Sequence, residues 1–389
     1  MKRLRIGVIY GGRSSEHEVS IASAASVIAN LNPSRYEPVP IRIERNGRWT
    51  LPDRESTEIL ENSVSNPTNI LDKESTETRH DVHLVADPTD DAIIIIEREP
   101  SDHRRSSGQQ TSAVERLPLD VVFPLIHGPY GEDGTLQGLL ELANVPYIGA
   151  GVLSSAVSMD KAVAKILFTA RGLPQVNYQI VTGNQWDMNA RTIATQIAAE
   201  LSYPLFVKPA NLGSSIGVSK VANKSQLSLA VERAREFDEK VIVESGVSHV
   251  REIECAVLGG DTPEVSVPGE IMPSGEFYDF HAKYFDKNSK LEIPANLTST
   301  QTESLQSLAV EAFRAVEGYG MARVDFLLSG KDGTVYLNEV NTIPGFTTAS
   351  MYAKLWEASG IGFVKLLDRL VDLALTRHDR KQRLRTTLT

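Results

Sequence analysis

The sequence contains very little cysteine. Cys255 is the single cysteine among 389 residues, which excludes an intramolecular disulfide framework and is consistent with a reducing compartment. It lies in the mostly apolar run 253–258, and free cysteine is among the most buried residue types. We therefore expect Cys255 to be a core residue and the protein to be cytoplasmic.

Long apolar runs are also missing. No stretch approaches the ~20 apolar residues that a membrane-spanning helix requires, so we expect a soluble protein that does not bind a membrane. Near the N-terminus the apolar run covers only residues 6–10, which is shorter than the ~7–15 residues of a signal-peptide core. We expect this run to form the first strand.

The sequence has no excess of positive charge. It contains 40 Lys and Arg against 50 Asp and Glu, a formal net charge of −10, which argues against a general nucleic-acid-binding protein. Any anionic ligand must therefore be held by local positive groups. With 41% hydrophobic and 23% charged residues, the composition is that of a globular protein, and the length allows about two or three domains.

The first region, residues 1–151, has the pattern of a doubly wound α/β domain. Its first strand is followed by two glycines. Ser15 and Glu18 come next, with the spacing of a capping box that begins a helix, and the Ala-rich stretch 20–31 continues it. Strand, glycine turn and helix are the first parts of such a domain.

Further along the first region, Asn46-Gly47 predicts a tight hairpin, because both residue types tolerate positive φ. Residues 53–116 are rich in polar residues and contain one apolar island at 92–96, so we interpret them as a surface insertion. Residues 119–126 form a nearly continuous apolar run. Such a run is typical of a strand buried on both faces of a parallel sheet.

Residues 152–250 predict a small α+β lobe, and residues 251–389 predict a third region. The helix that Asp160 opens in the second region ends near Gly172. The polar and basic residues 376–389 predict a solvated end. Other predicted elements are strands at 205–208, 218–221, 241–244, 252–258, 322–328 and 335–341, and helices at 225–237 and 303–316.

Four polar side chains in the third region form the most informative pattern. Arg323 and Asp325 lie on one predicted strand, Glu339 and Asn341 lie on the next, and residues two apart on a strand share a face. If the strands pair, the oxygens of Asp325, Glu339 and Asn341 form a cluster of hard ligands. Such a cluster suits Mg²⁺ shared with substrate phosphates. The alternative is the solvated face of an amphipathic hairpin.

A second pattern joins a lysine at a strand end to a flexible loop. Lys208 precedes residues 211–217, which contain two glycines and two serines. The spacing of the glycines and the lysine is not that of a P-loop. Taken without Lys208, the loop is explained equally well by a hairpin turn and by a lid over a phosphate. Lys208 favours the phosphate, because burying a lysine without an anionic partner is costly.

Two loops follow buried strands of the first region, where ligands of open α/β sheets bind. One contains Glu16 and the other contains His127. A packed or solvated histidine is an alternative for His127. For Glu16 the alternative is a favourable charge at a helix start.

Taken together, the motifs GG-SSEHEVS, HGPYGEDG, SMDK, VKPANLGSSIG, HAKY, RVDF and NEVNTIPGFTTASM resemble those of the D-alanine–D-alanine ligase family. The resemblance covers nearly the whole chain. It implies an N-terminal α/β domain and a two-lobed ATP-grasp fold, and a homodimer that makes D-alanyl-D-alanine for peptidoglycan precursors. Its small-molecule substrates are D-alanine and ATP.

The resemblance also implies a nucleotide and metal site. It assigns Lys161 and Lys208 to the ATP phosphates, and Ser214 and Ser215 to the γ-phosphate. It assigns Glu244 and Val247 to the adenine edge and Glu252 to the ribose. Two Mg²⁺ ions, for which Mn²⁺ can substitute, are bound by Asp325, Glu339 and Asn341. They neutralise charge as the phosphoryl group transfers.

The amino-acid sites follow from the same resemblance. Glu16 pairs with the ammonium of the first D-alanine, and His127 lies near its carboxylate, which becomes a D-alanyl phosphate. The amine of the second D-alanine then attacks. Its carboxylate is held by Lys283, Ser350 and the backbone of Met351.

The tetrahedral oxyanion formed in that attack requires donors. In the family these are Arg323 and the backbone N–H of Gly345. Tyr284, Ser214 and Glu16 are the candidates for assisting loss of a proton from the second substrate. Family members that use D-lactate typically lack a tyrosine at position 284, so Tyr284 favours an amine acceptor, although it could also be a loop packing residue.

Three alternatives to this function remain open. A sister ligase could use D-serine or D-lactate as the second substrate. An ATP-grasp carboxylase or phosphoribosylamine-type ligase is disfavoured by the loops of Glu16 and His127. A regulatory nucleotide-binding protein would be expected to lack a metal or oxyanion residue, and none is missing here. The sequence departs from compact family members at 53–116 and at Phe346, where some members carry methionine.

Overall fold

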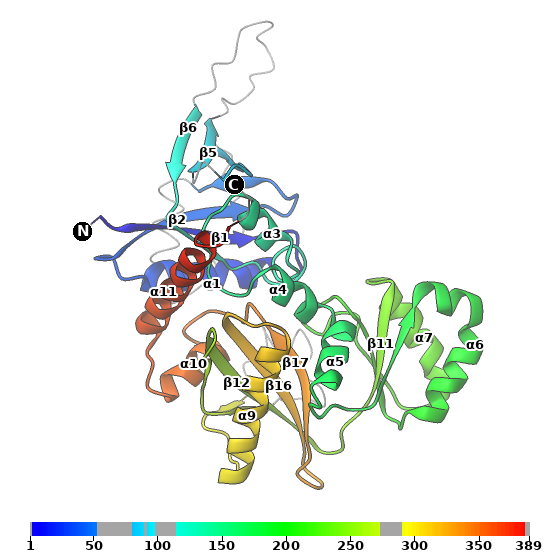
Figure 1. Ribbon diagram of the computed structural model, residues 1–389. Coiled ribbons are helices and arrows are strands. Elements are labelled where there is room, and N and C mark those ends of the chain that lie inside the picture. The colour runs from blue at the N-terminus through cyan, green and yellow to red at the C-terminus, as the bar shows by residue number, and fades with distance from the viewer. Residues whose placement is uncertain (1, 53–79, 89–91, 98–113, 273–289, 386–389) are drawn as a thin grey trace, which may run out of the picture. The chain divides into compact units, whose positions relative to one another are not determined.

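The computed structural model describes residues 2–52, 80–88, 92–97, 114–272 and 290–385 (Figure 1). Backbone contacts divide the chain into two compact units. Unit 1 contains Met1–Val152 and Ile343–Thr389, and unit 2 contains Leu153–Thr342. Residues from both ends of the chain therefore share one unit. In the described ranges, no helix combines the length and the low polarity required to cross a membrane.

Unit 1 is built on a mixed sheet with the strand order β6-β5-β4-β3-β2-β1-β7. The central strand β1 (Leu4–Gly11) pairs in parallel with β2 (Tyr36–Ile43) and with β7 (Val121–Pro124). Val8 in β1 and Phe123 in β7 are fully buried. The prediction of a first strand and of a buried parallel strand within 119–126 is confirmed.

The other strands of this sheet are antiparallel and extend it from β2. They are β3 (Trp49–Leu51), β4 (His80–Leu84), β5 (Ala92–Glu97) and β6 (Val114–Pro118). The sequence predicted only an insertion between 53 and 116, and its apolar island is strand β5. Residues 53–79, 89–91 and 98–113 of that segment lie outside the described residues.

The predicted hairpin joins β2 to β3, with Arg42 opposite Thr50. It is longer than a two-residue turn, because the Gly47 N–H donates to Glu44 O (2.8 Å) and the Glu44 N–H donates to Arg48 O (2.8 Å). Gly47 has a φ of 88°. A positive φ at this position favours glycine, which explains the residue found there.

Helix α1 (His17–Asn30) follows β1 as predicted, but its start differs from the prediction. Glu16 is the N-cap, and no side chain caps the helix there. The capping box from Ser15 to Glu18 is therefore wrong. The helix begins too late for Ser15 to be its N-cap, and the neighbouring hydroxyl of Ser14 instead accepts the Glu16 N–H at 3.1 Å.

The C-terminal segment completes unit 1. Helix α11 (Phe363–Gln382) packs against α1 and β7, and Figure 1 shows it in red beside α1. Arg377 donates to Gly149 O and to Tyr147 O, both at 2.7 Å. The expectation of a solvated end from residue 376 onward is therefore wrong at Arg377. Among the described residues, unit 1 also contains helices α3 (Thr135–Leu142) and α10 (Met351–Ala358), and α4 (Val152–Met159) begins at its boundary.

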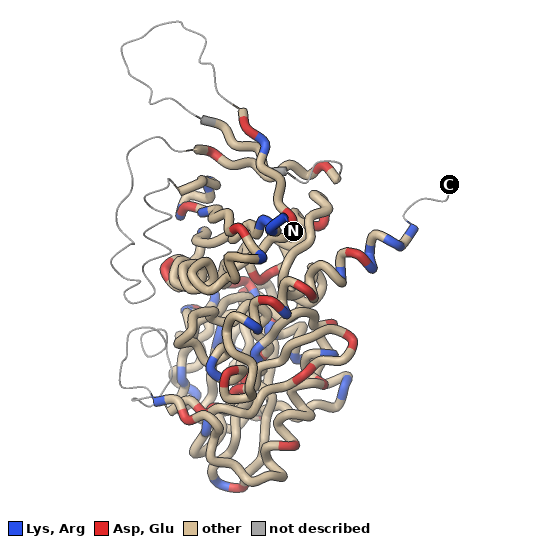
Figure 2. Tube along the Cα trace, turned by 90° about the vertical axis from the view of Figure 1, so that its left-hand side faces the viewer, with Lys and Arg blue, Asp and Glu red and all other residues tan. Residues whose placement is uncertain are grey.

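Charged residues of both signs are interspersed along α11, as Figure 2 shows. Near the start of α11, Asp368 pairs with Arg35 (3.0 Å). Lys381 pairs with Glu141 of α3 near its last turn. Ion pairs at both ends therefore join α11 to earlier parts of unit 1.

Unit 2 begins with a four-stranded antiparallel sheet in the order β10-β9-β11-β8. Its core contains Trp186, Leu205, Val207 and Val243, each at most 1% exposed. The strands are β8 (Tyr178–Thr182), β9 (Leu205–Pro209), β10 (Ser219–Val221) and β11 (Lys240–Ser245), with helices α6 (Gly183–Glu200) and α7 (Lys224–Arg235). The predicted small α+β lobe is present.

A second antiparallel sheet of unit 2 has the order β15-β14-β12-β16-β17, with β13 beside β12. Helices α5 (Lys161–Ala170) and α9 (Ser299–Ala315) contribute Phe168 and Phe313 to its core, and Cys255 is fully buried there as expected. The strands are β12 (Val250–Gly259), β13 (Glu264–Val265), β14 (Gly269–Met272), β15 (Lys290–Glu292), β16 (Gly320–Ser329) and β17 (Val335–Asn341).

Candidate active site

The predicted pairing of the two polar strands is confirmed. In the antiparallel ladder of β16 and β17, Arg323 lies opposite Asn341 and Asp325 lies opposite Glu339. Val324 between the two β16 residues is fully buried. Because alternate residues of a strand point to opposite faces, the four polar groups share one face.

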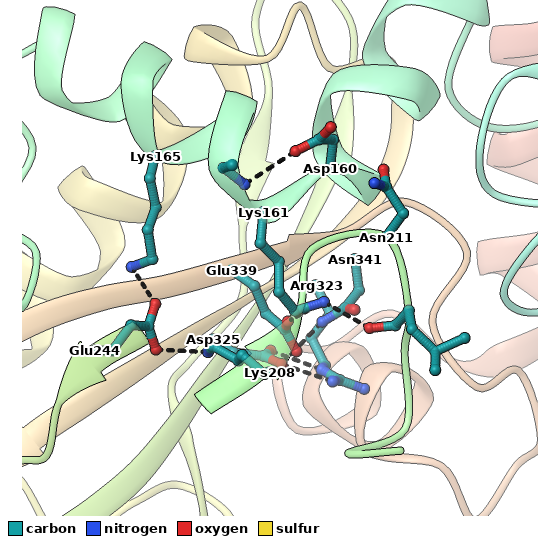
Figure 3. A network of polar contacts seen from close by, with 12 residues as sticks. Asp160, Lys161, Lys165, Lys208, Asn211, Glu244, Arg323, Asp325, Glu339 and Asn341 are labelled. Atoms are coloured by element: carbon teal, nitrogen blue, oxygen red, sulfur yellow. Dashed lines mark hydrogen bonds and ion pairs between the residues drawn. The ribbon is translucent and has the colours of Figure 1, made fainter. Parts of the chain in front are cut away.

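Asp325 is tightly bonded within this face (Figure 3). Arg323 donates to both of its oxygens, through Nε and Nη2, each at 2.7 Å. The Asn341 amide donates to Asp325 Oδ2 at 2.8 Å. The guanidinium of Arg323 therefore forms a bidentate pair with Asp325, the carboxylate predicted to be a metal ligand.

Sequence reasoning missed Glu254, the third carboxylate of this cluster. Glu254 on β12 lies opposite Asp325, is 5% exposed, and approaches Arg323 Nε at 3.1 Å. Burial lowers the pKa of Arg323, but the charges of Asp325 and Glu254 outweigh this and raise it well above its ordinary value. The only available signal was alternation, because Glu254 lies two residues after Glu252 and thus on the same face.

The metal prediction can be tested by the chemistry of the donors. Asp325, Glu339 and Asn341 offer two carboxylates and an amide, which are hard oxygen donors. Within the described ranges, no group of three or more His, Cys, Asp or Glu side chains forms a metal site by itself. This donor set fits an ion whose remaining ligands are waters and phosphate oxygens.

Lys161 joins the metal candidates to the glycine loop. It is the first residue of α5, whose N-cap Asp160 accepts the N–H groups of Ala162 (3.0 Å) and Val163 (3.1 Å). The Lys161 Nζ donates to Leu212 O at 2.9 Å and lies 3.4 Å from Glu339 Oε2. The predicted N-cap is confirmed. It fixes the start of α5 and therefore the position of Lys161.

Glu244 on β11 lies between two lysines. Its Oε2 is 2.6 Å from Lys208 Nζ, and its Oε1 is 2.8 Å from Lys165 Nζ. Burial raises the pKa of Glu244, but the two lysine charges outweigh burial and lower it to about 2. Lys208 thus has an anionic partner inside the protein, so its burial alone does not require a phosphate. Lys165 was missed, because its partner is distant in sequence.

The glycine loop has an unusual backbone. Ser214 and Ser215 have φ values of 52° and 57°, and Gly217 has a φ of 73°. Left-handed conformations cost non-glycine residues roughly 1–2 kcal/mol each, and they cluster at ligand-binding loops. Tight hairpin turns also place two adjacent residues at positive φ, but they favour Asn and Gly there. Two serines in this conformation therefore indicate a strained loop and not an ordinary turn.

Several of these groups line a cavity of about 160 Å³ in unit 2. Apolar side chains, among them Phe206, Val218 and Leu327, lie beside the lysines and carboxylates. Apolar walls with a few polar groups suit a planar base, and the lysines suit phosphates. The predicted nucleotide and metal residues among its lining are Lys161, Lys208, Ser214, Ser215, Glu244, Val247, Glu252 and Glu339.

The predicted amino-acid residues of unit 1 form a second group. His127 is 3% exposed, and both of its ring nitrogens have protein partners: Nδ1 is 2.9 Å from Ile343 O and Nε2 is 3.1 Å from Ser23 Oγ. These bonds fix the ring. They also match the packed histidine that was the alternative for this residue.

The Glu16 loop lies against the His127 loop. Gly128 has a φ of 77°, and a Cβ there would lie 3.1 Å from both Glu16 Oε2 and Ser14 Oγ. Only glycine allows this close approach without strain. Glu16 is 7% exposed, so its carboxylate is held in a defined place.

Gly345, Ser350 and Met351 belong to one turn of unit 1. The Ser350 hydroxyl accepts the Thr347 N–H at 3.0 Å, and Met351 is the first residue of α10. Ser23, which sequence reasoning missed, also contacts this turn, because its hydroxyl accepts the Phe346 N–H at 3.2 Å. Ser23 therefore links the turn to His127. Lys283 and Tyr284 lie outside the described residues.

Comparisons with known proteins cover both units. A family model described as D-ala D-ala ligase N-terminus matches residues 5–150, and one described as D-ala D-ala ligase C-terminus matches residues 167–372. A D-alanine--D-alanine ligase of Heliobacterium modesticaldum is 46% identical over 383 residues, 98% of each chain. One of Geobacillus thermodenitrificans is 45% identical over 381 residues, also 98% of each chain.

Two solved structures are similar over nearly their whole length. The D-alanine-D-alanine ligase from Coxiella burnetii has a TM-score of 0.79 and 34% identity, covering 98% of this chain and 97% of that chain. The VanG D-Ala:D-Ser ligase from Enterococcus faecalis has a TM-score of 0.81 and 34% identity, covering 96% of this chain and 100% of that chain.

Proposed function

The chain belongs to the D-alanine–D-alanine ligase family, and from this premise we infer that it joins two D-alanines to D-alanyl-D-alanine for peptidoglycan synthesis. It has the ATP-grasp fold of the family and is an ATP-using, divalent-metal-dependent ligase. The observation that carries this function is the match at 46% identity over 98% of each chain.

For the nucleotide, the cavity of unit 2 supports one arrangement. Lys161 and Lys208 bind the phosphates, and Ser214 and Ser215 close over the γ-phosphate. Glu244 and Val247 hold the adenine edge and Glu252 the ribose. All of these residues line the cavity.

For the metal, we propose two Mg²⁺ ions held by Asp325, Glu339 and Asn341, with Mn²⁺ as a possible substitute. The donor chemistry on this face supports the proposal. When bound, the ions neutralise phosphate charge during transfer. Lys161 lies 3.4 Å from Glu339, so it adds a further positive charge at the same place.

For the amino acids, Glu16 binds the ammonium of the first D-alanine, and His127 lies near its carboxylate, which accepts the phosphoryl group. The amine of the second D-alanine attacks this acyl phosphate, and phosphate leaves. Ser350, the Met351 backbone and Lys283 hold the second carboxylate. Glu16, Ser214 and Tyr284 are the candidates for assisting proton loss.

Arg323 and the Gly345 N–H donate to the oxyanion that forms in this attack. Arg323 suits the role because Asp325 and Glu254 hold its guanidinium on both sides, and preorganised donors need no rearrangement as charge develops.

The functional lobes we propose are 1–151, 152–250 and 251–389. We also propose a cytoplasmic homodimer, for which sedimentation of the full chain is the direct test.

A second acceptor is the alternative with specific support. The structure of a D-Ala:D-Ser ligase matches this chain with a TM-score of 0.81, so D-serine is the rival of D-alanine at the second site. Phosphate release with D-alanine, D-serine, D-lactate and L-alanine, together with the mass of the product, decides between them. Release with D-alanine and the mass of a dipeptide support the proposal, whereas a D-alanine-independent ATPase contradicts it.

A further inference from the structure

Lys165 is a buried lysine that contacts the nucleotide site without lining its cavity. It lies one helical turn beyond Lys161 on α5, and its side chain is 1% exposed. Its Nζ reaches Glu244 Oε1 at 2.8 Å, while Lys208 occupies Oε2 at 2.6 Å. Figure 3 shows the two lysines approaching the same carboxylate from different elements.

The surroundings of Lys165 favour its ion pair with Glu244. Its Nζ lies 5.3 Å from the centre of the Tyr178 ring, which provides a second favourable contact for a cation. Burial lowers the pKa of Lys165, and Glu244 opposes that shift. A buried charge requires a partner. Lys165 is 1% exposed and does not line the cavity, and Glu244 is the carboxylate that it contacts.

The proposed function assigns the other lysine a different task during turnover. If Lys208 binds the ATP phosphates, its charge is shared with them or moves away from Glu244. The carboxylate would then be a buried anion whose remaining cation is Lys165. Without that cation, burial would favour the protonated form of Glu244.

We propose that Lys165 is a positioning residue that keeps Glu244 ionised and fixed as an acceptor for the amino group of adenine, and so sets the preference for ATP over GTP. This inference rests on the proposed function, in which Glu244 contacts the adenine edge. An ionised carboxylate can only accept hydrogen bonds, whereas a protonated one can also donate. Adenine presents an amino donor at C6, but guanine presents a carbonyl acceptor there. An ionised Glu244 therefore rejects guanine.

Two variants of the full chain test the inference. Lys165→Met removes the charge and keeps the length, and Lys165→Gln keeps a hydrogen-bond donor without the charge, so it serves if the first does not fold. We expect the ratio of kcat/KM for ATP over GTP to fall by about 10–100-fold in either, the size of a lost bond to a charged group. The loss should appear mainly in the KM for ATP.

Three further variants separate positioning from a structural effect. Lys240→Met is the matched control, because Lys240 pairs with Asp160, the N-cap of the same helix, but does not line the cavity. Its ATP-to-GTP ratio should stay within about twofold of wild type. Adding Lys165→Met to Glu244→Gln should also change the ratio by less than about twofold, because the two residues act through one contact.

The outcomes distinguish this inference from the proposed function. An unchanged ATP-to-GTP ratio in both Lys165 variants overturns the inference, as does an equal loss with both nucleotides, which indicates a merely structural role. If the wild-type chain shows no D-alanine-dependent phosphate release, the proposed function fails. The inference is then tested by the change in Tm on adding ADP or GDP, which requires no amino acid: a Lys165 variant that loses the preference for ADP supports it, and one that keeps the preference overturns it.

Discussion

Asp325 and Glu339 lie directly opposite each other on β16 and β17, yet different cations hold them. Asp325 is bonded to Arg323 through two hydrogen bonds of 2.7 Å. Glu339 instead lies 3.4 Å from Lys161, on the side of the nucleotide cavity. Asp325 therefore contacts the proposed oxyanion donor Arg323. Glu339 contacts Lys161, which is proposed to bind the ATP phosphates.

Glu339→Gln is expected to abolish turnover at ordinary Mg²⁺ concentrations, because an amide keeps the shape of the side chain but removes the charge that holds the metal. Phosphate release measured over a Mg²⁺ titration checks this. The matched control is Asp332→Asn, the same chemical change in the exposed turn of the same hairpin, where Asp332 accepts the Thr334 N–H at 3.0 Å. Normal turnover of Glu339→Gln would remove this residue from the metal site.

Arg323→Ala is expected to lower kcat by ~10²–10³, the usual effect of removing an oxyanion donor. The measurement is phosphate release at saturating D-alanine and ATP. Arg251→Ala is the control, because Arg251 forms a similar bidentate pair with Glu270 (2.9 and 2.5 Å) on the same sheet and has no proposed catalytic role. Equal losses in the two variants would indicate damage to the sheet.

Gly131→Ala and Gly138→Ala should have opposite effects on stability. A Cβ at Gly131 would lie 2.1 Å from Ile126 O, whereas one at Gly138 meets nothing within 4 Å. The first should lower the free energy of unfolding by about 1–3 kcal/mol or more. The second replaces glycine inside α3 and should raise it by about 0.5–1 kcal/mol. Urea unfolding followed by circular dichroism checks both, and equal shifts would contradict the predicted packing.

Glu244→Gln should destabilise the protein in a pH-dependent way. The pKa of Glu244 is lowered from 4.5 to about 2, which corresponds to about 3 kcal/mol of stability at neutral pH. A lowered pKa gives stability that is complete above the unfolded value and is lost as pH falls through the folded value. The gap between wild type and variant should therefore close between pH 4.5 and about 2.

Urea unfolding at several pH values measures that gap. Glu311→Gln is the matched control, because Glu311 forms an exposed pair with Arg314 on one helix, and exposed pairs contribute little. Its effect should be small at every pH. A gap for Glu244→Gln that stays constant down to about pH 2 would show that the charge of Glu244 is not what stabilises the site.

Local patterns in the sequence predicted much of unit 2. Alternation along β16 and β17 was sufficient to place Arg323, Asp325, Glu339 and Asn341 on one face, because a strand has a fixed period of two. The Asp160 N-cap was likewise predictable, since a side chain that accepts backbone N–H groups must lie at the helix start. In both cases the interaction lies within a few residues or follows from one strand pairing.

The parts that could not be predicted depend on contacts between distant residues. Strands β4 and β6 are short and polar, so only their pairing with neighbours makes them strands. Lys165 and Ser23 have ordinary sequence surroundings, and their importance comes from partners on other elements. Glu244 was assigned through family resemblance, but its position between two lysines was visible only in the structure.

Unit 1 is assembled from the first and the last parts of the chain. Phe346 packs on Phe123 with ring centres 5.4 Å apart, and α11 covers α1. A ribosome makes residues 343–389 only after the whole of unit 2 has been synthesised. Because domains generally fold as units during synthesis, unit 2 can reach its native state first, and the unit that begins the chain is completed last.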